Sequence, residues 1–238
     1  MTMRDVGADH AHKVYPKQFA RDDFWSQIKR TVNGEPVSEE NIAMIVAQIE
    51  RHLALEAGGR LVDLGCGNAA LASRLLPKLE AYTGVDFSEY LLGVAREYFS
   101  EEGKTDYVEQ DALSFVQDCA NPERYDKVLC YGCMSYLSHD DLLALLRSLT
   151  ERFANLTHVF FGNVPDRAKA PDFFARRNVT EYDIYDPQTP IGVWWDPAEL
   201  CGAARELGFE AEAVRMPAEF YGATYRFDLT LRHGTARG

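Results

Sequence analysis

Short apolar segments alternate with amphipathic stretches along most of this chain, and this alternation limits the folds open to it. The first four segments begin near residues 60, 81, 105 and 125, at intervals of about twenty residues. A connection of that length accommodates a crossover helix, which joins parallel strands. The pattern therefore predicts an α/β fold built on a mostly parallel sheet. The strand candidates are RLVDLG, AYTGVDF, TDYVEQD, YDKVLCYG and, starting near 157, THVFFGN.

The C-terminal part of the chain predicts an antiparallel pair that finishes this sheet. The runs FEAEAVRMP and TYRFDLTLR are separated by a short loop that contains Gly222. Residues with capping chemistry mark where several helices begin. These helix starts are Ser38, Ser88, Ser138 with Asp141, and Asp196 with Pro197 and Glu199.

Residues 1–57 differ in composition from the rest of the chain. Residues 1–37 are polar with interspersed aromatic residues, and a helical pattern follows from Ser38 to the pair Gly58-Gly59. We expect an N-terminal helical cap over 1–57 and a main domain over 58–238. The segment 164–195 carries four prolines without clear periodicity, which is typical of a binding loop, and 171–177 is expected to form a small helix within it.

Composition narrows the classes of partner. The chain has 25 Lys and Arg against 37 Asp and Glu, a formal charge of -12, which argues against nonspecific attraction to nucleic acid. No apolar run approaches the length of a membrane span, so we expect a cytoplasmic protein without a membrane partner. Five cysteines fit a reducing compartment, and Cys130 and Cys133 lack a second pair, so no metal site is expected.

The stretch VDLGCGNAAL, residues 62–71, predicts a buried strand, a glycine turn and the start of a helix. Gly65, Gly67 and Ala70 match the spacing of a dinucleotide-binding turn. Asp86 follows Gly67 by nineteen residues, at the end of the second strand, where a ribose-binding acid belongs. On these residues alone a nicotinamide-dependent oxidoreductase stays open as an alternative.

Further carboxylates favour a cationic ligand over a pyrophosphate. Asp63 lies inside the first strand, where it would repel a pyrophosphate and attract an ammonium group. Asp111 follows the third strand and can accept a hydrogen bond from an exocyclic amine. Because parallel strands end at the same edge of a sheet, we expect Asp63, Asp86 and Asp111 to bind a positively charged nucleoside together.

The motif D-L-G-C-G-N followed by G-V-D-F-S resembles that of the class I S-adenosylmethionine-dependent methyltransferases, over about residues 58–232. The resemblance implies a Rossmann-like, doubly wound, seven-stranded sheet, mostly parallel with an antiparallel C-terminal strand. It also implies S-adenosylmethionine as the cofactor. The residues that it places on the cofactor are Asp63, Gly65, Cys66 and Gly67 for the methionyl part and sugar, Asp86 for the ribose hydroxyls, Phe87 for packing on adenine, Asp111 and Ala112 for the adenine edge, and Tyr131 for the methyl-transfer chamber.

The expected acceptor is a small metabolite methylated on oxygen or nitrogen, in natural-product or sugar biosynthesis. The carboxylates of the metal-dependent branch and the Asp/Asn-Pro-Pro-aromatic tetrad of the branch that methylates nucleic-acid amines are both missing after the fourth strand. No catalytic base is assigned. The candidates are Tyr131, Tyr136, His139 and Asn163, with His10 and His12 in the terminal segment.

Two further alternatives concern the acceptor and the activity. Cations near the site would suit an anionic acceptor, although such charges more often form a solvated face. The protein could also be a non-catalytic subunit that keeps the cofactor pocket, and its oligomeric state is open. The cations considered are Arg167, Lys169, Arg176 and Arg177 in the long segment, with Lys13, Lys17, Lys29 and Arg30 near the start.

Overall fold

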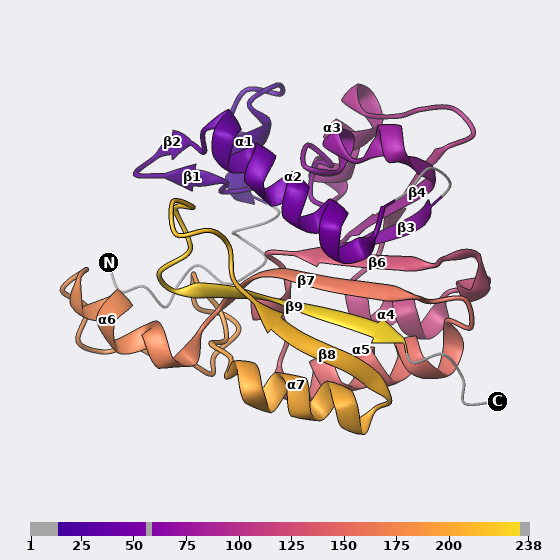
Figure 1. Cartoon of the computed structure of the whole chain (residues 1–238). Helices are drawn as coiled ribbons and strands as arrows, with labels where there is room; N and C mark the ends of the chain where they lie inside the picture. Colours follow the sequence, from indigo (N-terminus) through magenta and orange to yellow (C-terminus); the bar gives the residue numbers. More distant parts are fainter. Residues whose placement is uncertain (1–13, 56–58, 234–238) are drawn as a thin grey trace.

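A computed structural model describes residues 14–55 and 59–233 of the chain (Figure 1). Seven strands form one sheet in the order β5-β4-β3-β6-β7-β9-β8. All neighbours pair in parallel except β9, which runs antiparallel to both β7 and β8. The predicted mostly parallel sheet with an antiparallel C-terminal strand is therefore confirmed. The strands are β3 (Gly59–Leu64), β4 (Leu79–Asp86), β5 (Thr105–Glu109), β6 (Lys127–Tyr131), β7 (His158–Pro165), β8 (Phe209–Val214) and β9 (Arg226–His233).

Helices cover both faces of the sheet. Figure 1 shows α2 across one side and α5 with α7 on the other, and the two large clusters of buried apolar residues divide accordingly. A third, small cluster of Ala170, Phe173 and Trp194 lies in the segment after β7. Among the described residues, no helix is both long enough and apolar enough to cross a membrane. The main helices are α2 (Glu39–Leu53), α3 (Glu89–Tyr98), α4 (Ala112–Asp118), α5 (His139–Arg152), α6 (Ala170–Ala175) and α7 (Pro197–Glu206).

Helix α2 packs directly on the sheet. Ser38 caps it by accepting from the Asn41 N–H, and its buried stripe of Ile42, Ile45, Ile49 and Leu53 faces the strands. Its contacts are with β6 and β7, near the middle of the sheet. Before it come η3 (Tyr15–Gln18), α1 (Phe24–Gln27) and a small hairpin of β1 (Thr31–Val32) with β2 (Glu35–Pro36). The domain division at residue 57 stays a prediction.

The prediction of a helix after the glycine turn is wrong. The chain between β3 and β4 forms turns and two 3-10 helices, η4 (Ala72–Arg74) and η5 (Leu76–Lys78). Ala69 adopts a left-handed φ of 60°, which an α-helix does not allow. Pro77 then prevents the following turn from continuing as a helix, because its ring removes a backbone donor.

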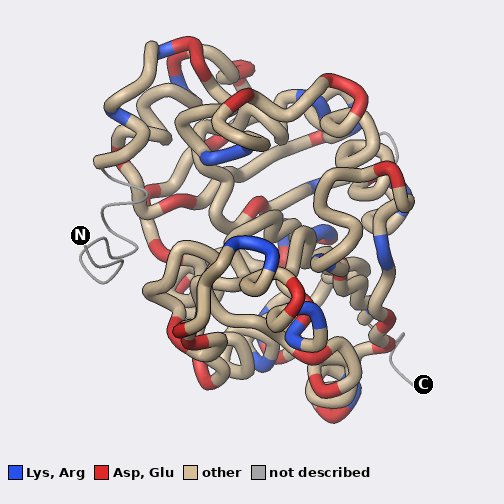
Figure 2. Tube along the Cα trace, turned by 90° about the vertical axis from the view of Figure 1, so that its left-hand side faces the viewer, with Lys and Arg blue, Asp and Glu red and all other residues tan. Residues whose placement is uncertain are grey.

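The two ends of the long segment 166–195 lie side by side. Asp166 and Trp195 form a β-bridge, and the Trp195 N–H donates to the Pro165 carbonyl at 2.9 Å. The small helix expected over 171–177 is present as α6. In Figure 2, acidic positions are spread over the described trace with basic ones interspersed.

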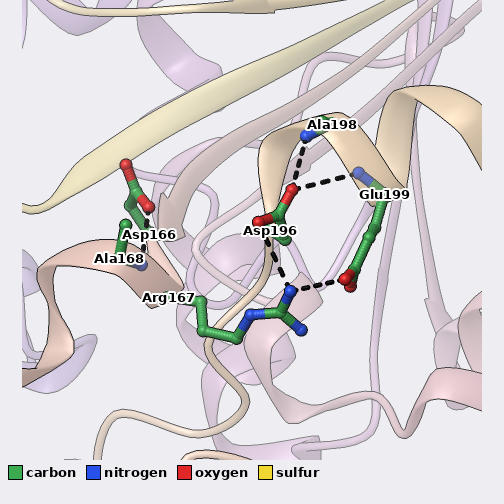
Figure 3. A network of polar contacts seen from close by, with 6 residues as sticks. All are labelled: Asp166, Arg167, Ala168, Asp196, Ala198 and Glu199. Carbon is green, nitrogen blue, oxygen red and sulfur yellow. Dashed lines mark hydrogen bonds and ion pairs between the residues drawn. The ribbon is translucent and has the colours of Figure 1, made fainter.

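A polar network fixes the base of this segment to α7 (Figure 3). Asp196 caps α7 by accepting from the N–H groups of Ala198 at 2.8 Å and Glu199 at 3.1 Å. The Arg167 guanidinium pairs with the Asp196 and Glu199 carboxylates. Because these side chains are partly exposed, the cap bonds should contribute more than the ion pairs.

We expect Asp196→Ala to lower the free energy of unfolding by about 1 kcal/mol, because it removes both cap bonds. Arg167→Gln should cost less than about 0.5 kcal/mol, since it removes only exposed ion pairs. Urea denaturation of both variants measures the difference. An equal cost for the two variants would contradict this account of the network.

Candidate functional site

One cavity lies at the carboxyl ends of the parallel strands β3 to β6. It brings together all nine residues that the sequence placed on the cofactor: Asp63, Gly65, Cys66, Gly67, Asp86, Phe87, Asp111, Ala112 and Tyr131. Apart from Tyr136, the rest of the wall consists of residues that the sequence did not place on the cofactor. They are Ile28, Arg30, Leu71, Val85, Leu91, Gln110, Gly132, Cys133 and Leu137.

Asp86, at the end of β4, holds the glycine turn in place. Its carboxylate accepts the Gly67 N–H at 2.9 Å and the Ser88 N–H at 2.8 Å. Burial raises the pKa of this carboxyl, and the backbone N–H groups counteract part of that rise. The same side chain therefore shapes the turn and presents a carboxylate to the cavity.

The turn glycines are needed by the chain itself. Gly65 and Gly67 have φ values of +77° and +58°, which other residues rarely adopt. A Cβ on Gly65 would lie 2.6 Å from the Cys133 Sγ, and one on Gly67 would lie 2.9 Å from the Ile28 Cγ2. The turn is thus packed between the segment after β6 and the N-terminal segment.

Asp63 is a buried carboxylate inside β3. The Tyr82 hydroxyl donates to its Oδ2 at 3.1 Å. Burial, with a smaller contribution from the nearby Asp86 charge, raises the pKa of Asp63 to about 7. A cation bound beside it would favour the ionised form, so the site is suited to a positively charged group.

Asp111 lies at the rim of the cavity and is exposed. Its Oδ1 accepts the Ser114 N–H at 2.8 Å and so caps α4, while Ala112 beside it is buried. The expected trio of carboxylates therefore consists of two buried groups and one exposed helix cap. Joint binding of a nucleoside by all three stays a prediction.

Arg30 reaches the cavity from the segment between α1 and β1. Arg30 is only 8% exposed, and its guanidinium lies 4.7 Å from the centre of the Tyr131 ring. Among residues 14–55 and 59–233, the Arg30 Nε has no hydrogen-bond partner and the side chain forms no ion pair with a carboxylate. The reading of Arg30 as part of a solvated face is wrong, because its neighbours in space, not in sequence, bury it.

Only some of the catalytic candidates lie at the cavity. Tyr131 and Tyr136 line the cavity, and Asn163 lies just beyond Gly132, with its Nδ2 3.5 Å from where a Gly132 Cβ would stand. His139 is a mostly exposed residue at the start of α5, does not line the cavity and stacks on Trp195. His10, His12 and Lys13 lie outside the described residues.

The cations of the long segment do not reach this site. Arg167 pairs with carboxylates at the start of α7, and the Arg177 guanidinium lies over the Phe173 ring. Lys169 and Arg176 also do not line the cavity. Within the described residues, no group of three or more His, Cys, Asp or Glu side chains is arranged to hold a metal ion.

Comparison with known proteins decides the family. The model of a methyltransferase domain matches residues 61–154. A ubiquinone biosynthesis O-methyltransferase from Thiobacillus denitrificans is 31% identical over 176 residues, which cover 71% of this chain and 69% of that protein. The chain belongs to the class I S-adenosylmethionine-dependent methyltransferases. This membership overturns the nicotinamide alternative.

Other relatives of this methyltransferase match shorter stretches. A ubiquinone biosynthesis O-methyltransferase from Stutzerimonas stutzeri is 29% identical over 140 residues, 58% of each chain. One from Aliivibrio fischeri is 33% identical over 115 residues, 48% of this chain and 47% of that protein. The chain therefore spans only about half of the length of these curated relatives.

Solved structures share the fold of this methyltransferase. The N-methyltransferase NodS from Bradyrhizobium japonicum, in complex with S-adenosyl-L-homocysteine, has a TM-score of 0.64 at 16% identity, over 95% of this chain and 100% of that one. The magnesium protoporphyrin IX methyltransferase from Synechocystis has a TM-score of 0.59 at 18% identity, over 81% and 82%. At these identities the likeness concerns the fold.

We expect Asp63→Asn to stabilise the ligand-free protein at pH 8. The raised pKa means that the folded state disfavours the ionised carboxyl, so stability is lost as pH rises from about 4 to about 7. The shift from 3.8 to about 7 corresponds to at most about 4 kcal/mol, and Asn can still accept from Tyr82. Urea denaturation at pH 5 and pH 8 measures the difference, with exposed Asp106→Asn as the control. If the free energies of unfolding of the wild type and Asp63→Asn differed by the same amount at pH 5 and pH 8, the raised pKa of Asp63 would be contradicted.

Proposed function

We propose that this protein binds S-adenosylmethionine in the described cavity and transfers its methyl group to an oxygen atom of a small acceptor. The observation that carries the proposal is the charge pattern of the cavity, which combines buried carboxylates with a single buried guanidinium among its described lining residues. Transfer to oxygen is supported by the names of the curated relatives. The natural-product or sugar setting stays a prediction, since those names concern ubiquinone biosynthesis.

The lining residues fit the parts of this cofactor. Its amino-acid end carries an ammonium and a carboxylate, which suit Asp63 and Arg30 respectively. Arg30 is buried and has no carboxylate partner among residues 14–55 and 59–233, and a buried cation is costly unless an anion such as that of a ligand pairs with it. Asp86 keeps oxygen lone pairs for the ribose hydroxyls, and Phe87 with Ala112 offers apolar contact for adenine.

When bound, the cofactor supplies a methyl group on a positively charged sulfur, so the chain has only to orient the acceptor and exclude water. Ile28 from the N-terminal segment and Leu137 after β6 contribute apolar side chains to the cavity wall. Tyr131 and Tyr136 form the aromatic wall toward Asn163. We propose these three side chains as the acceptor contacts and assign no general base.

The described cavity lining contains a single Lys or Arg side chain, Arg30, which supports an anionic acceptor less well than a neutral one. The cofactor's own carboxylate suits Arg30, and the other cations considered from the sequence among the described residues do not line the cavity. The remaining alternative is a partner subunit that binds the cofactor without catalysis. Binding without methyl transfer would favour it.

We expect Arg30→Gln to weaken S-adenosylhomocysteine binding by about 10- to 100-fold, because a charged hydrogen bond contributes about 1.5–3 kcal/mol. Binding of 5′-methylthioadenosine, which lacks the amino-acid end, should change less than about twofold. Isothermal titration calorimetry measures both dissociation constants.

Lys29→Gln is the matched control, because Lys29 is adjacent, exposed and outside the cavity lining. Equal losses for both ligands in Arg30→Gln would show a general disturbance of the site. Unchanged binding of both would remove Arg30 from the cofactor site.

Methyl transfer is tested with S-adenosylmethionine labelled in the methyl group. We expect labelled product from a phenol such as catechol or 3,4-dihydroxybenzoate, and none from Asp86→Asn. In that variant an amide N–H2 would face one of the two backbone donors that now bind the carboxylate. Tight cofactor binding with no labelled phenol or amine would contradict the proposed activity.

A further inference from the structure

Buried polar atoms without a hydrogen-bond partner lie around Gly132, at the cavity wall and just behind it. Among the described residues they include the Arg30 Nε, the Tyr131 hydroxyl and the Asn163 Oδ1. Arg30 lies over the Tyr131 ring, and a Cβ on Gly132 would stand 3.4 Å from an Arg30 nitrogen and 3.5 Å from the Asn163 Nδ2. Such atoms are costly to leave unpaired, so their position marks where a polar ligand group binds.

Asn163 reaches this place through an irregularity in β7. The pairing of β7 with β9 shifts register between Phe161 and Val164, and Asn163 has a φ of 67°. A left-handed, non-glycine residue inside a strand persists only where its surroundings hold it. Such strained positions concentrate at functional sites.

Two residues of β9 hold the Asn163 backbone. The Asp228 Oδ1 accepts the Asn163 N–H at 2.7 Å, and the Arg226 guanidinium donates to the Asn163 carbonyl. Asp228 is only 1% exposed and does not line the cavity. Its hydrogen bond to the Asn163 N–H therefore links it to the acceptor end without direct contact with the cavity.

We propose that Asp228 is a positioning residue of the acceptor site, which fixes the β7 bulge so that the Asn163 amide faces the acceptor. The inference rests on the proposed methyl transfer and adds a residue of β9 to it. The buried Asn163 Oδ1, which has no hydrogen-bond partner among the described residues, can accept from an acceptor hydroxyl, and the Nδ2 can donate to a ring substituent.

The surroundings explain why a carboxylate stands at residue 228. Arg226 on β9, the Gln48 side chain on α2 and the Asn163 N–H all favour its charged form, whereas burial raises its pKa to about 6. Tyr131 on β6 is the other titratable group that this charge affects, and the pKa of Tyr131 is raised well above its usual range mainly by burial. A charged acceptor forms a stronger bond to the Asn163 N–H than a neutral one.

The first test is nuclear magnetic resonance of the S-adenosylhomocysteine complex with isotope-labelled asparagine. The Asn163 backbone amide is assigned from its loss in Asn163→Gly, which tolerates the left-handed φ. Its proton resonance should move between about pH 5 and pH 7 as Asp228 ionises, and should not move in Asp228→Asn. A resonance that does not titrate in the wild type would overturn the proposal, whatever the acceptor.

The second test separates positioning from folding by kinetics. With a phenol that the wild type methylates, Asp228→Ala should lower kcat/KM for the acceptor about tenfold or more, while the dissociation constant of S-adenosylhomocysteine changes less than about twofold. Asp228→Asn should restore most of the loss, because its Oδ1 can accept the same N–H. Asn163→Gly should lower kcat/KM for the acceptor to the same extent as Asp228→Ala and leave the dissociation constant of S-adenosylhomocysteine equally unchanged.

Thr230→Val is the matched control, since Thr230 is two residues along β9, buried, and makes no bond to Asn163. A fully active Asn163→Gly, or an equal loss of cofactor binding in Asp228→Ala, would overturn the positioning role. Failure of the wild type to methylate any phenol or amine would instead count against the proposed function. In that case the pH dependence of the Asn163 amide resonance still tests whether Asp228 binds the Asn163 backbone.

Discussion

The site depends on one carboxylate, that of Asp86, which joins two strand ends. Its bonds to the N–H groups of Gly67 and Ser88 connect the turn after β3 with the start of α3. Because this carboxylate sits at the edge where the parallel strands end, the same charge that orders the turn also faces the cavity. Burial of Asp63, with a smaller contribution from the Asp86 charge, then leaves a site that a cation stabilises.

The N-terminal segment completes the site by packing on that turn. The buried Asn68 side chain donates to the Phe24 carbonyl at 2.8 Å and to the Gln27 Oε1 at 2.9 Å, which places Ile28 against Gly67. Arg30 follows two residues later and lies over the ring of Tyr131 from β6. The cavity is thus formed between the sheet and a segment that precedes it in the chain. Any change that releases Asn68 should affect the amino-acid end of the site first.

The parts of the fold that follow from local patterns were predictable. The alternation of strands and helices, the caps at Ser38, Ser138 and Asp196, and the antiparallel final strand are all confirmed. The helix after the glycine turn was wrong because the left-handed Ala69 depends on how the turn packs, which local spacing does not show.

The site was predictable only where residues follow the strand ends. Asp63, Asp86 and Tyr131 could be placed at one edge because parallel strands end together. Arg30 could not, since it is buried where it lies over the ring of Tyr131, which is about a hundred residues away in the sequence. Asp228 carries no sequence signal either, because its role arises from a register shift between β7 and β9.

The most direct measurement is a crystal structure of the protein with S-adenosylhomocysteine. The account predicts ribose hydroxyls at the Asp86 carboxylate, the amino-acid carboxylate at the Arg30 guanidinium, and the sulfur facing Tyr131 and Tyr136. Ligand density bound elsewhere, such as in the polar hollow beside Lys17 and Tyr90, would contradict it.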